Sequence, residues 1–245
     1  MLEEKKSTGQ SFTFKHFRVD QDQCTMKVGT DGVLLGAWAP IEHQPISILD
    51  IGTGTGLIAL MLAQRSSAEQ IDALEIDENA FEQAVNNFEN SPWSDRLFCF
   101  HAGLDEFMEE PEDEYDLIVS NPPFYSEDYK TENEQRDLAR FQDALPFEDL
   151  IEAADLLLSE NGILAVIIPF KEETKFIDLA KDFELFPMKI THVKGTPTTE
   201  IKRSLIAFSR TEKTKISIDE LIIEITRHNY TEEYIALTSE FYLKM

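Results

Sequence analysis

Short apolar runs alternate with longer amphipathic stretches along most of the chain. The runs have the length of buried strands, and the stretches between them repeat hydrophobic residues at helical spacing. Predicted strands cover residues 46–51, 71–76, 97–101, 115–120, 163–169, 187–194 and 204–209. Predicted helices cover residues 33–39, 57–65, 78–90, 147–159, 172–183 and 231–241. This alternation predicts an α/β fold with a mostly parallel sheet and right-handed crossovers.

Five segments lie outside this alternation. Residues 12–19 and 24–28 alternate loosely and predict two short N-terminal strands that pair as a hairpin. Residues 105–114 form an acidic connector, and residues 216–225 favour a strand, with a helix as the alternative. Residues 125–145 are polar and without a clear period, and long insertions of this kind often serve as lids.

Length and composition indicate one large globular domain over residues 1–245, with an apolar fraction of 42%. No apolar run approaches the ~20 residues that span a bilayer, and the first residues lack a signal-peptide core. We therefore expect a cytoplasmic protein without membrane contact. Cys24 and Cys99 read as free thiols, and neither they nor the five histidines have the spacing of a metal site.

The net charge of -25 and the pI near 4.4 are opposite to those of a usual nucleic-acid binder. The charges are unevenly distributed, however. Residues 66–129 hold many acids and a single base, whereas residues 189–215 hold seven bases and two acids, and residues 1–30 add five bases. This pattern favours a small basic rim on an acidic body, although a uniformly solvated acidic surface is the simpler alternative.

The run at residues 115–120 ends abruptly in an Asn-Pro-Pro-Phe tetrapeptide. Proline has no N–H group for a strand ladder, so the strand must stop there. The turn presents the Asn121 amide and the Pro122 carbonyl, which can accept hydrogen bonds from an amine on an aromatic ring. Phe124 can stack on that ring. The predicted catalytic residues are therefore Asn121, Pro122, Pro123 and Phe124, and the alternative is an ordinary strand terminator beside a surface phenylalanine.

A glycine-rich turn follows the first core strand and contains Gly52, Gly54 and Gly56. Its spacing differs from the dinucleotide fingerprint, and no P-loop lysine follows it. Asp50 opens the turn and suits a cationic amino-acid group, while Glu75, at the end of the next strand, suits a ribose diol. A nucleoside with a cationic amino-acid tail is S-adenosylmethionine. The alternative is a turn without a ligand.

The order strand, glycine turn, helix, acid, helix, strand and Asn-Pro-Pro-Phe resembles amino-group methyltransferases that use S-adenosylmethionine. Residues 26–38 and 230–243 resemble, more narrowly, the flanks of the bacterial tRNA-1-valine (adenine-37-N6)-methyltransferase family. The resemblance implies a Rossmann-like sheet of the class I methyltransferase type, with seven strands and the last antiparallel. Residues 1–40 would be a short β extension that closes over the cofactor, and residues 41–245 the catalytic core and tail.

The same resemblance implies N6 of adenine 37 in the anticodon loop of tRNA-1-valine as the target. We expect direct in-line transfer of the methyl group without a metal, by a monomer. It places Thr30 and Asp31 in the segment over the cofactor, with a helix N-cap as the alternative role. Gly103 stands where the family usually has an acid that holds the adenine amine. Either a backbone contact takes this role or Asp105 does, and a plain helix cap is the alternative role of Asp105. The predicted RNA contacts, whose alternative is solvated surface charge, are Arg136, Arg140, Lys202 and Arg203.

Three rival functions use the same motifs. A release-factor glutamine methyltransferase also methylates a planar amide, but it usually ends the tetrapeptide in tyrosine and carries an N-terminal helical domain. A guanine-N2 rRNA methyltransferase is the second rival. The third is a silent S-adenosylmethionine-binding module, against which the intact Asn121 and glycine turn argue.

Overall fold

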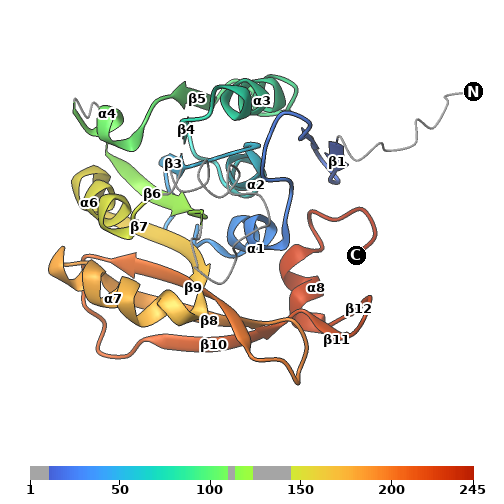
Figure 1. Cartoon of the computed structure of the whole chain (residues 1–245), viewed down its shortest axis with the longest axis vertical. Coiled ribbons are helices and arrows are strands. Elements are labelled where there is room, and N and C mark those ends of the chain that lie inside the picture. Colours follow the sequence, from blue (N-terminus) through green and yellow to red (C-terminus); the bar gives the residue numbers. More distant parts are fainter. Residues whose placement is uncertain (1–10, 110–113, 124–144) are drawn as a thin grey trace, which may run out of the picture.

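The predicted strands assemble into one eight-stranded sheet in the computed structural model, which describes residues 11–109, 114–123 and 145–245 (Figure 1). The strands are β3 (Ser47–Ile51), β4 (Gln70–Glu75), β5 (Leu97–His101), β6 (Tyr115–Ser120), β7 (Leu158–Pro169), β8 (Phe186–Lys194), β9 (Ile201–Ser209) and β10 (Ser217–Ile222). Their order across the sheet is β10-β8-β9-β7-β6-β3-β4-β5. The pairs from β5 to β7 are parallel, and β9 runs antiparallel between β7 and β8.

The expected count of seven strands was wrong by one. β10 pairs in parallel with β8 and extends the sheet at that edge, so the strand prediction for residues 216–225 is confirmed and the helix alternative was wrong. Without β10, the edge of β8 would expose unpaired backbone groups. The isoleucine-rich segment of β10 pairs with these groups. The antiparallel strand expected at the end of the core is β9.

Helices cover both faces of the sheet and bury two separate hydrophobic clusters (Figure 1). One cluster involves α1 (Thr30–Trp38), α2 (Leu57–Arg65), α3 (Glu78–Glu89) and α8 (Glu232–Thr238). The other involves α4 (Leu104–Glu109), α6 (Phe147–Leu157) and α7 (Glu173–Asp182), which follows the short 3-10 helix η2 (Phe170–Glu172). None of the helices in the described part of the chain is long and apolar enough to cross a membrane.

The N-terminal region differs from its prediction. β1 (Ser11–Thr13) and β2 (Arg18–Asp20) form an antiparallel hairpin within the first predicted strand, and residues 24–28 form no strand. Side chains take the backbone N–H groups that a ladder would need: Val28 N donates to Gln21 Oε1, and Gln23 N donates to Gln83 Oε1. The segment is therefore fastened by glutamines rather than by a partner strand.

Two other regions also differ. The predicted acidic connector contains α4, because Leu104, Phe107 and Met108 share the face that packs against the second hydrophobic cluster. Before α8, the chain forms a small hairpin of β11 (Glu224–Thr226) and β12 (Asn229–Tyr230). The long insertion predicted at residues 125–145 lies almost wholly outside the described residues.

Candidate functional site

Strand register places the glycine turn and the Asn-Pro-Pro segment side by side. Ile51, the last residue of β3, pairs with Ser120 of β6 and with Leu74 of β4. The Ser120 hydroxyl also donates to the Ile51 carbonyl oxygen at 2.9 Å. Gly52 follows β3, Asn121 follows β6, and Glu75 is the last residue of β4, so all three lie at the carboxyl edge of the sheet. Ligands of open α/β sheets bind at this edge, outside the carboxyl ends of the strands.

The glycine turn has the left-handed backbone that only glycine adopts without strain. The φ angles of Gly52, Gly54 and Gly56 are 73°, 56° and 78°. A Cβ atom at Gly56 would meet the Phe88 ring at 2.5 Å, whereas one at Gly52 or Gly54 would meet nothing within 4 Å. Gly56 is therefore required by packing, and the other two face open space that a ligand can occupy.

Asp50 lies beneath the turn and is fully buried. Its Oδ2 accepts hydrogen bonds from the Thr53 hydroxyl at 2.6 Å and from Ala59 N at 3.2 Å, so this carboxyl group fixes the turn to the start of α2. Its Oδ1 has no hydrogen-bond partner among the described residues. Burial raises the pKa of Asp50 to about 7, although the two hydrogen bonds act in the opposite direction. A buried oxygen without a partner fits a cationic ligand group above the turn.

Glu75 joins the next strand to the same turn. Its Oε2 accepts from Gly54 N at 2.8 Å, and its Oε1 accepts from Asp77 N at 2.9 Å. Burial raises the pKa of Glu75, and these backbone hydrogen bonds lower it only in part. A carboxylate offers about four acceptor sites, so Glu75 keeps acceptor capacity for a diol. Asp77 Oδ1 accepts from Ala80 N at 2.8 Å and caps α3.

An exposed isoleucine stands beside Glu75 and was missed as a site residue. Ile76 is 60% exposed, and its Cδ1 lies 3.7 Å from the position of a Cβ on Gly103. The Asp105 carboxyl group also lies against Gly103, at 2.6 Å from that position. Asp105 is therefore close to Ile76, and it is exposed in the first helical turn of α4. Ile76 offers an apolar surface for a flat ring. The feature of the sequence that could have revealed it is an apolar residue directly after Glu75, where β4 ends.

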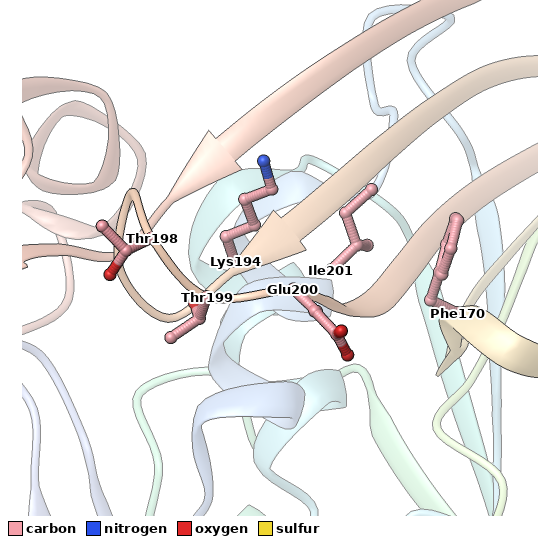
Figure 2. A pocket seen from close by; sticks show the side chains of 6 residues that line it. All are labelled: Phe170, Lys194, Thr198, Thr199, Glu200 and Ile201. Atoms are coloured by element: carbon pink, nitrogen blue, oxygen red, sulfur yellow. The ribbon is translucent and has the colours of Figure 1, made fainter.

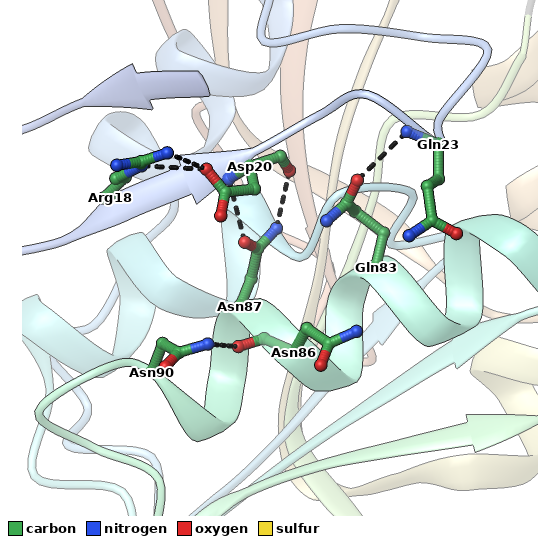
Figure 3. A network of polar contacts seen from close by, with 7 residues as sticks. All are labelled: Arg18, Asp20, Gln23, Gln83, Asn86, Asn87 and Asn90. Carbon is green, nitrogen blue, oxygen red and sulfur yellow. Dashed lines mark hydrogen bonds and ion pairs between the residues drawn. The ribbon is translucent and has the colours of Figure 1, made fainter. Parts of the chain in front are cut away.

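The N-terminal segment is hydrogen-bonded to α3 (Figure 3), and α3 in turn is hydrogen-bonded to the glycine turn. The Asn87 amide donates to the carbonyl oxygens of Asp20 and Thr55, at 2.9 and 2.8 Å, and accepts from Asp20 N. One buried side chain thus connects β2 with the glycine turn. Sequence reasoning also missed Asn87, whose signal is a polar residue within the buried stripe of α3.

The structure joins two residues that were assigned to different roles. Arg203 Nε lies 2.8 Å from Asp31 Oδ2, and the two side chains are 32% and 30% exposed. Arg203 of β9 therefore holds the start of α1, where Thr30 is exposed. Gly29 is the N-cap of α1, so neither Thr30 nor Asp31 is the cap. Lys202 is exposed.

Several other basic side chains of residues 189–215 also have partners within the protein. Lys194 pairs with Glu220 and Arg210 with Asp155, while Lys189 lies over the Trp38 ring at 4.7 Å. The basic rim of residues 189–215 is thus weaker than its composition predicted. Phe124, Arg136 and Arg140 lie outside the described residues, whereas Asn121 and Pro123 are half-buried and Pro122 is buried. Within the described ranges, no group of three His, Cys, Asp or Glu could hold a metal ion.

Comparisons with known proteins agree with this geometry. The family model of the methyltransferase small domain matches residues 39–189. The tRNA1(Val) (adenine(37)-N6)-methyltransferase of Flavobacterium johnsoniae is 79% identical over 234 residues, which cover 96% of this chain and all of that protein. Its namesake in Parabacteroides distasonis is 46% identical, covering 96% of this chain and 98% of that protein.

Solved structures show the fold. A predicted O-methyltransferase from Agrobacterium tumefaciens superposes with a TM-score of 0.68 at 19% identity, covering 86% of this chain and 96% of that one. A ribosomal protein L11 methylase from Lactobacillus delbrueckii gives a TM-score of 0.56 at 16% identity, covering 79% of this chain and 84% of that one. The sheet is therefore the Rossmann-like sheet of class I methyltransferases, with one added strand. With this fold and these relatives, the chain belongs to the tRNA1(Val) (adenine(37)-N6)-methyltransferase family.

Proposed function

We propose that this protein transfers a methyl group from S-adenosylmethionine to N6 of an adenine in tRNA, namely adenine 37 of tRNA-1-valine. The observation that carries the proposal is the register that sets the glycine turn beside Asn121. A methyl donor in the turn and an amine held by Asn121 would then be neighbours. The relatives are named for adenine methylation in tRNA, which favours this function over glutamine methylation.

The residues around the turn fit S-adenosylmethionine. The open space at Gly52 and Gly54 lets the ligand approach the main chain of the turn. The Asp50 oxygen without a partner suits the ammonium group of the ligand. Glu75 has acceptor sites for the ribose diol, while Ile76 and Asp105 would flank the adenine. The cofactor supplies an electrophilic methyl group on a sulfonium. The N-terminal segment, fastened by Asn87, would close over it.

The acceptor side needs orientation rather than a strong base. The lone pair of an aromatic amine is delocalised into its ring. Hydrogen bonds from the amine to the Asn121 side-chain oxygen and the Pro122 carbonyl would fix its direction and localise that lone pair. Proximity and orientation of this kind supply much of the acceleration in two-substrate reactions. The target base must leave its stack to reach this turn.

Radiolabelled methyl transfer to separate pools of tRNA, rRNA and release factor tests the proposal against its rivals. We expect label in tRNA alone. Label in release factor would favour the glutamine methyltransferase, and label in rRNA the guanine methyltransferase. No transfer to any pool, with cofactor binding intact, would indicate a silent binding module.

Replacing Glu75 with alanine should weaken S-adenosylmethionine binding. The variant loses hydrogen bonds from the ribose to a carboxylate, worth about 1.5–3 kcal/mol each, and also frees Gly54 N. Calorimetry of the variant and of Glu78→Ala, an exposed acid in the first turn of α3, measures the effect. Equal affinities for the two variants would refute the ribose assignment.

Cofactor binding should tighten as pH rises from 5 to 7. The pKa of Asp50 without cofactor is about 7, well above its ordinary value of 3.8. In the cofactor-free protein this group therefore contributes full stability below pH 3.8, and that contribution is lost as pH rises to about 7. A cationic ligand favours the carboxylate, so binding releases a proton, and the affinity should rise by up to about tenfold per pH unit.

Calorimetry in buffers of different ionisation enthalpy would count the released protons. Asp50→Asn should remove most of the pH dependence, leaving only the part that Glu75 contributes. A wild-type protein whose affinity is level from pH 5 to 7 would contradict the role of Asp50.

Neutralising Lys202 should weaken tRNA binding and reduce its salt dependence. Each lost phosphate contact lowers the slope of log K against log salt by about 0.7 for a single strand. Lys213→Ala is the matched control, because that lysine is also exposed but follows the opposite end of β9. Equal slopes for both variants would place the RNA elsewhere.

A further inference from the structure

An open cleft of about 410 Å³ lies at the far side of the candidate site, away from the glycine turn. Its lining comes from η2, the end of β8, the loop after it and the start of β9: Phe170, Lys194, Thr198, Thr199, Glu200 and Ile201. Figure 2 shows Phe170, Lys194 and Ile201 projecting to one side of the strands, with Glu200 on the other. Nothing in the proposed transfer reaction uses this cleft.

The register ties the cleft to the strand that carries Asn121. Ser120, the last residue of β6, pairs in parallel with Val166 of β7. Phe170 follows directly after β7, whose last residue, Pro169, pairs with Arg203 of β9. Neighbouring strands are about 4.8 Å apart, and the stretch from Val166 to Phe170 adds up to roughly 13 Å along the strand direction. The cleft therefore lies at the same carboxyl edge of the sheet as Asn121 and one strand to the side, within reach of nucleotides beside the target.

Phe170 presents a fixed aromatic ring at this position. The ring is 38% exposed, and His192 packs against it edge-on, with 5.0 Å between centroids and 81° between planes. His192 Nε2 donates to Glu173 Oε2 at 2.8 Å, and the same oxygen accepts from the buried Ser204 hydroxyl at 2.5 Å. These contacts hold the ring in place while leaving part of it open. Exposed aromatic rings of this kind are the usual platforms for unpaired bases.

The polar groups around the ring suit a nucleotide. The Lys194 ammonium is held by Glu220 at 2.7 Å, and Lys202 follows the cleft residue Ile201 and is exposed. The Thr198 hydroxyl can bond to a base edge, whereas the Thr199 hydroxyl already donates to Thr196 O at 2.9 Å and accepts from Thr196 N at 3.0 Å. The Glu200 carboxylate projects to the other side of the strands and repels phosphate, which leaves the Lys194 side of the cleft for the phosphate.

We propose that the cleft holds a nucleotide of the RNA loop directly beside the target adenine, with its base stacked on Phe170. The inference rests on the proposed function and adds residues that recognise the surroundings of the target. Phe170 is the stacking residue, and Glu173 and His192 are positioning residues that act through it.

The first test compares substitutions at Phe170 in the whole protein, with an unmodified transcript of tRNA-1-valine as substrate. Phe170→Ala should raise KM for the transcript about tenfold, as loss of one base stack does, with kcat changed by less than about twofold because the methyl-transfer residues are untouched. Phe170→Tyr keeps the ring and should retain the wild-type KM. Phe98→Ala, at a 47% exposed phenylalanine on the opposite edge strand β5, should have no effect.

The second test changes the RNA. Removing the base on one side of the target adenine, and then on the other, should raise KM for the wild type in one of the two substrates. The Phe170→Ala variant should not distinguish that substrate from the intact transcript. If Phe170→Ala is unstable, the wild type alone still provides a test. Its KM must rise on removal of one flanking base and not on removal of the other.

Two results would overturn the cleft assignment. One is an unchanged KM in a folded Phe170→Ala variant. The other is that Phe170→Ala and removal of the flanking base each raise KM by the same factor whether or not the other change is present. Both leave wild-type methylation of tRNA intact. A wild type that methylates no tRNA would instead refute the proposed function itself.

Discussion

Replacing Asn121 with alanine should stop methyl transfer while leaving S-adenosylmethionine binding nearly unchanged. The side-chain oxygen would hold the acceptor amine, and its neighbour Gly52 belongs to the separate cofactor turn. Misplacing reacting groups by about 1 Å costs roughly a hundredfold in rate, so the single-turnover rate should fall at least that far. Rapid-quench measurements with a tRNA transcript would record it, and calorimetry would record the cofactor affinity.

Asn121→Asp is the matched control for this experiment. Aspartate has nearly the same shape and keeps an oxygen that accepts from the amine, so the variant should retain part of the rate that alanine loses. If alanine and wild type react at similar rates, the Asn-Pro-Pro segment only terminates β6.

Gly54→Ala should remove most of the cofactor affinity without unfolding the protein. The added Cβ would meet no protein atom within 4 Å, but it would enter the space assigned to the ligand. The left-handed backbone at Gly54 adds a strain of about 1–2 kcal/mol to the folded state. We expect a small loss in melting temperature and at least a tenfold loss of affinity, about 1.4 kcal/mol.

Melting and binding separate the two effects in Gly54→Ala. Backbone strain acts on the folded state whether or not the ligand is present, whereas the steric conflict appears only when the ligand binds. A variant with a lowered melting temperature but unchanged affinity would show that the open space is not the cofactor site.

Much of the fold could be predicted because its strands are uniformly apolar and its turns carry distinctive residues. The Ile-Ser-Ile-Leu-Asp run and the prolines after Ser120 fixed the limits of β3 and β6 within a residue or two. β10 was harder to place in a sheet, since only Leu221 is buried in it and its pairing with β8 is far from local. Residues 24–28 form no strand because the Gln21 and Gln83 side chains accept hydrogen bonds from backbone N–H groups of this region, which no periodicity encodes.

The candidate site was predictable where it is local in sequence. The glycine turn and the Asn-Pro-Pro segment can each be identified from a short stretch of sequence. The register that places them side by side follows from a parallel sheet. Contacts between distant segments were not predictable in the same way. The Asp31–Arg203 ion pair, the Asn87 bridge and the Phe170 cleft each depend on which elements pack together.

The most direct test of the account is to map the methylated atom. Purified protein, S-adenosylmethionine and an unmodified tRNA-1-valine transcript would be incubated, and the digested product analysed by mass spectrometry. The account predicts one N6-methyladenosine in the fragment that carries adenine 37, and none when that adenine is replaced by guanine. Methylation of another nucleotide, or an unmodified transcript beside a fully cofactor-bound protein, would contradict it.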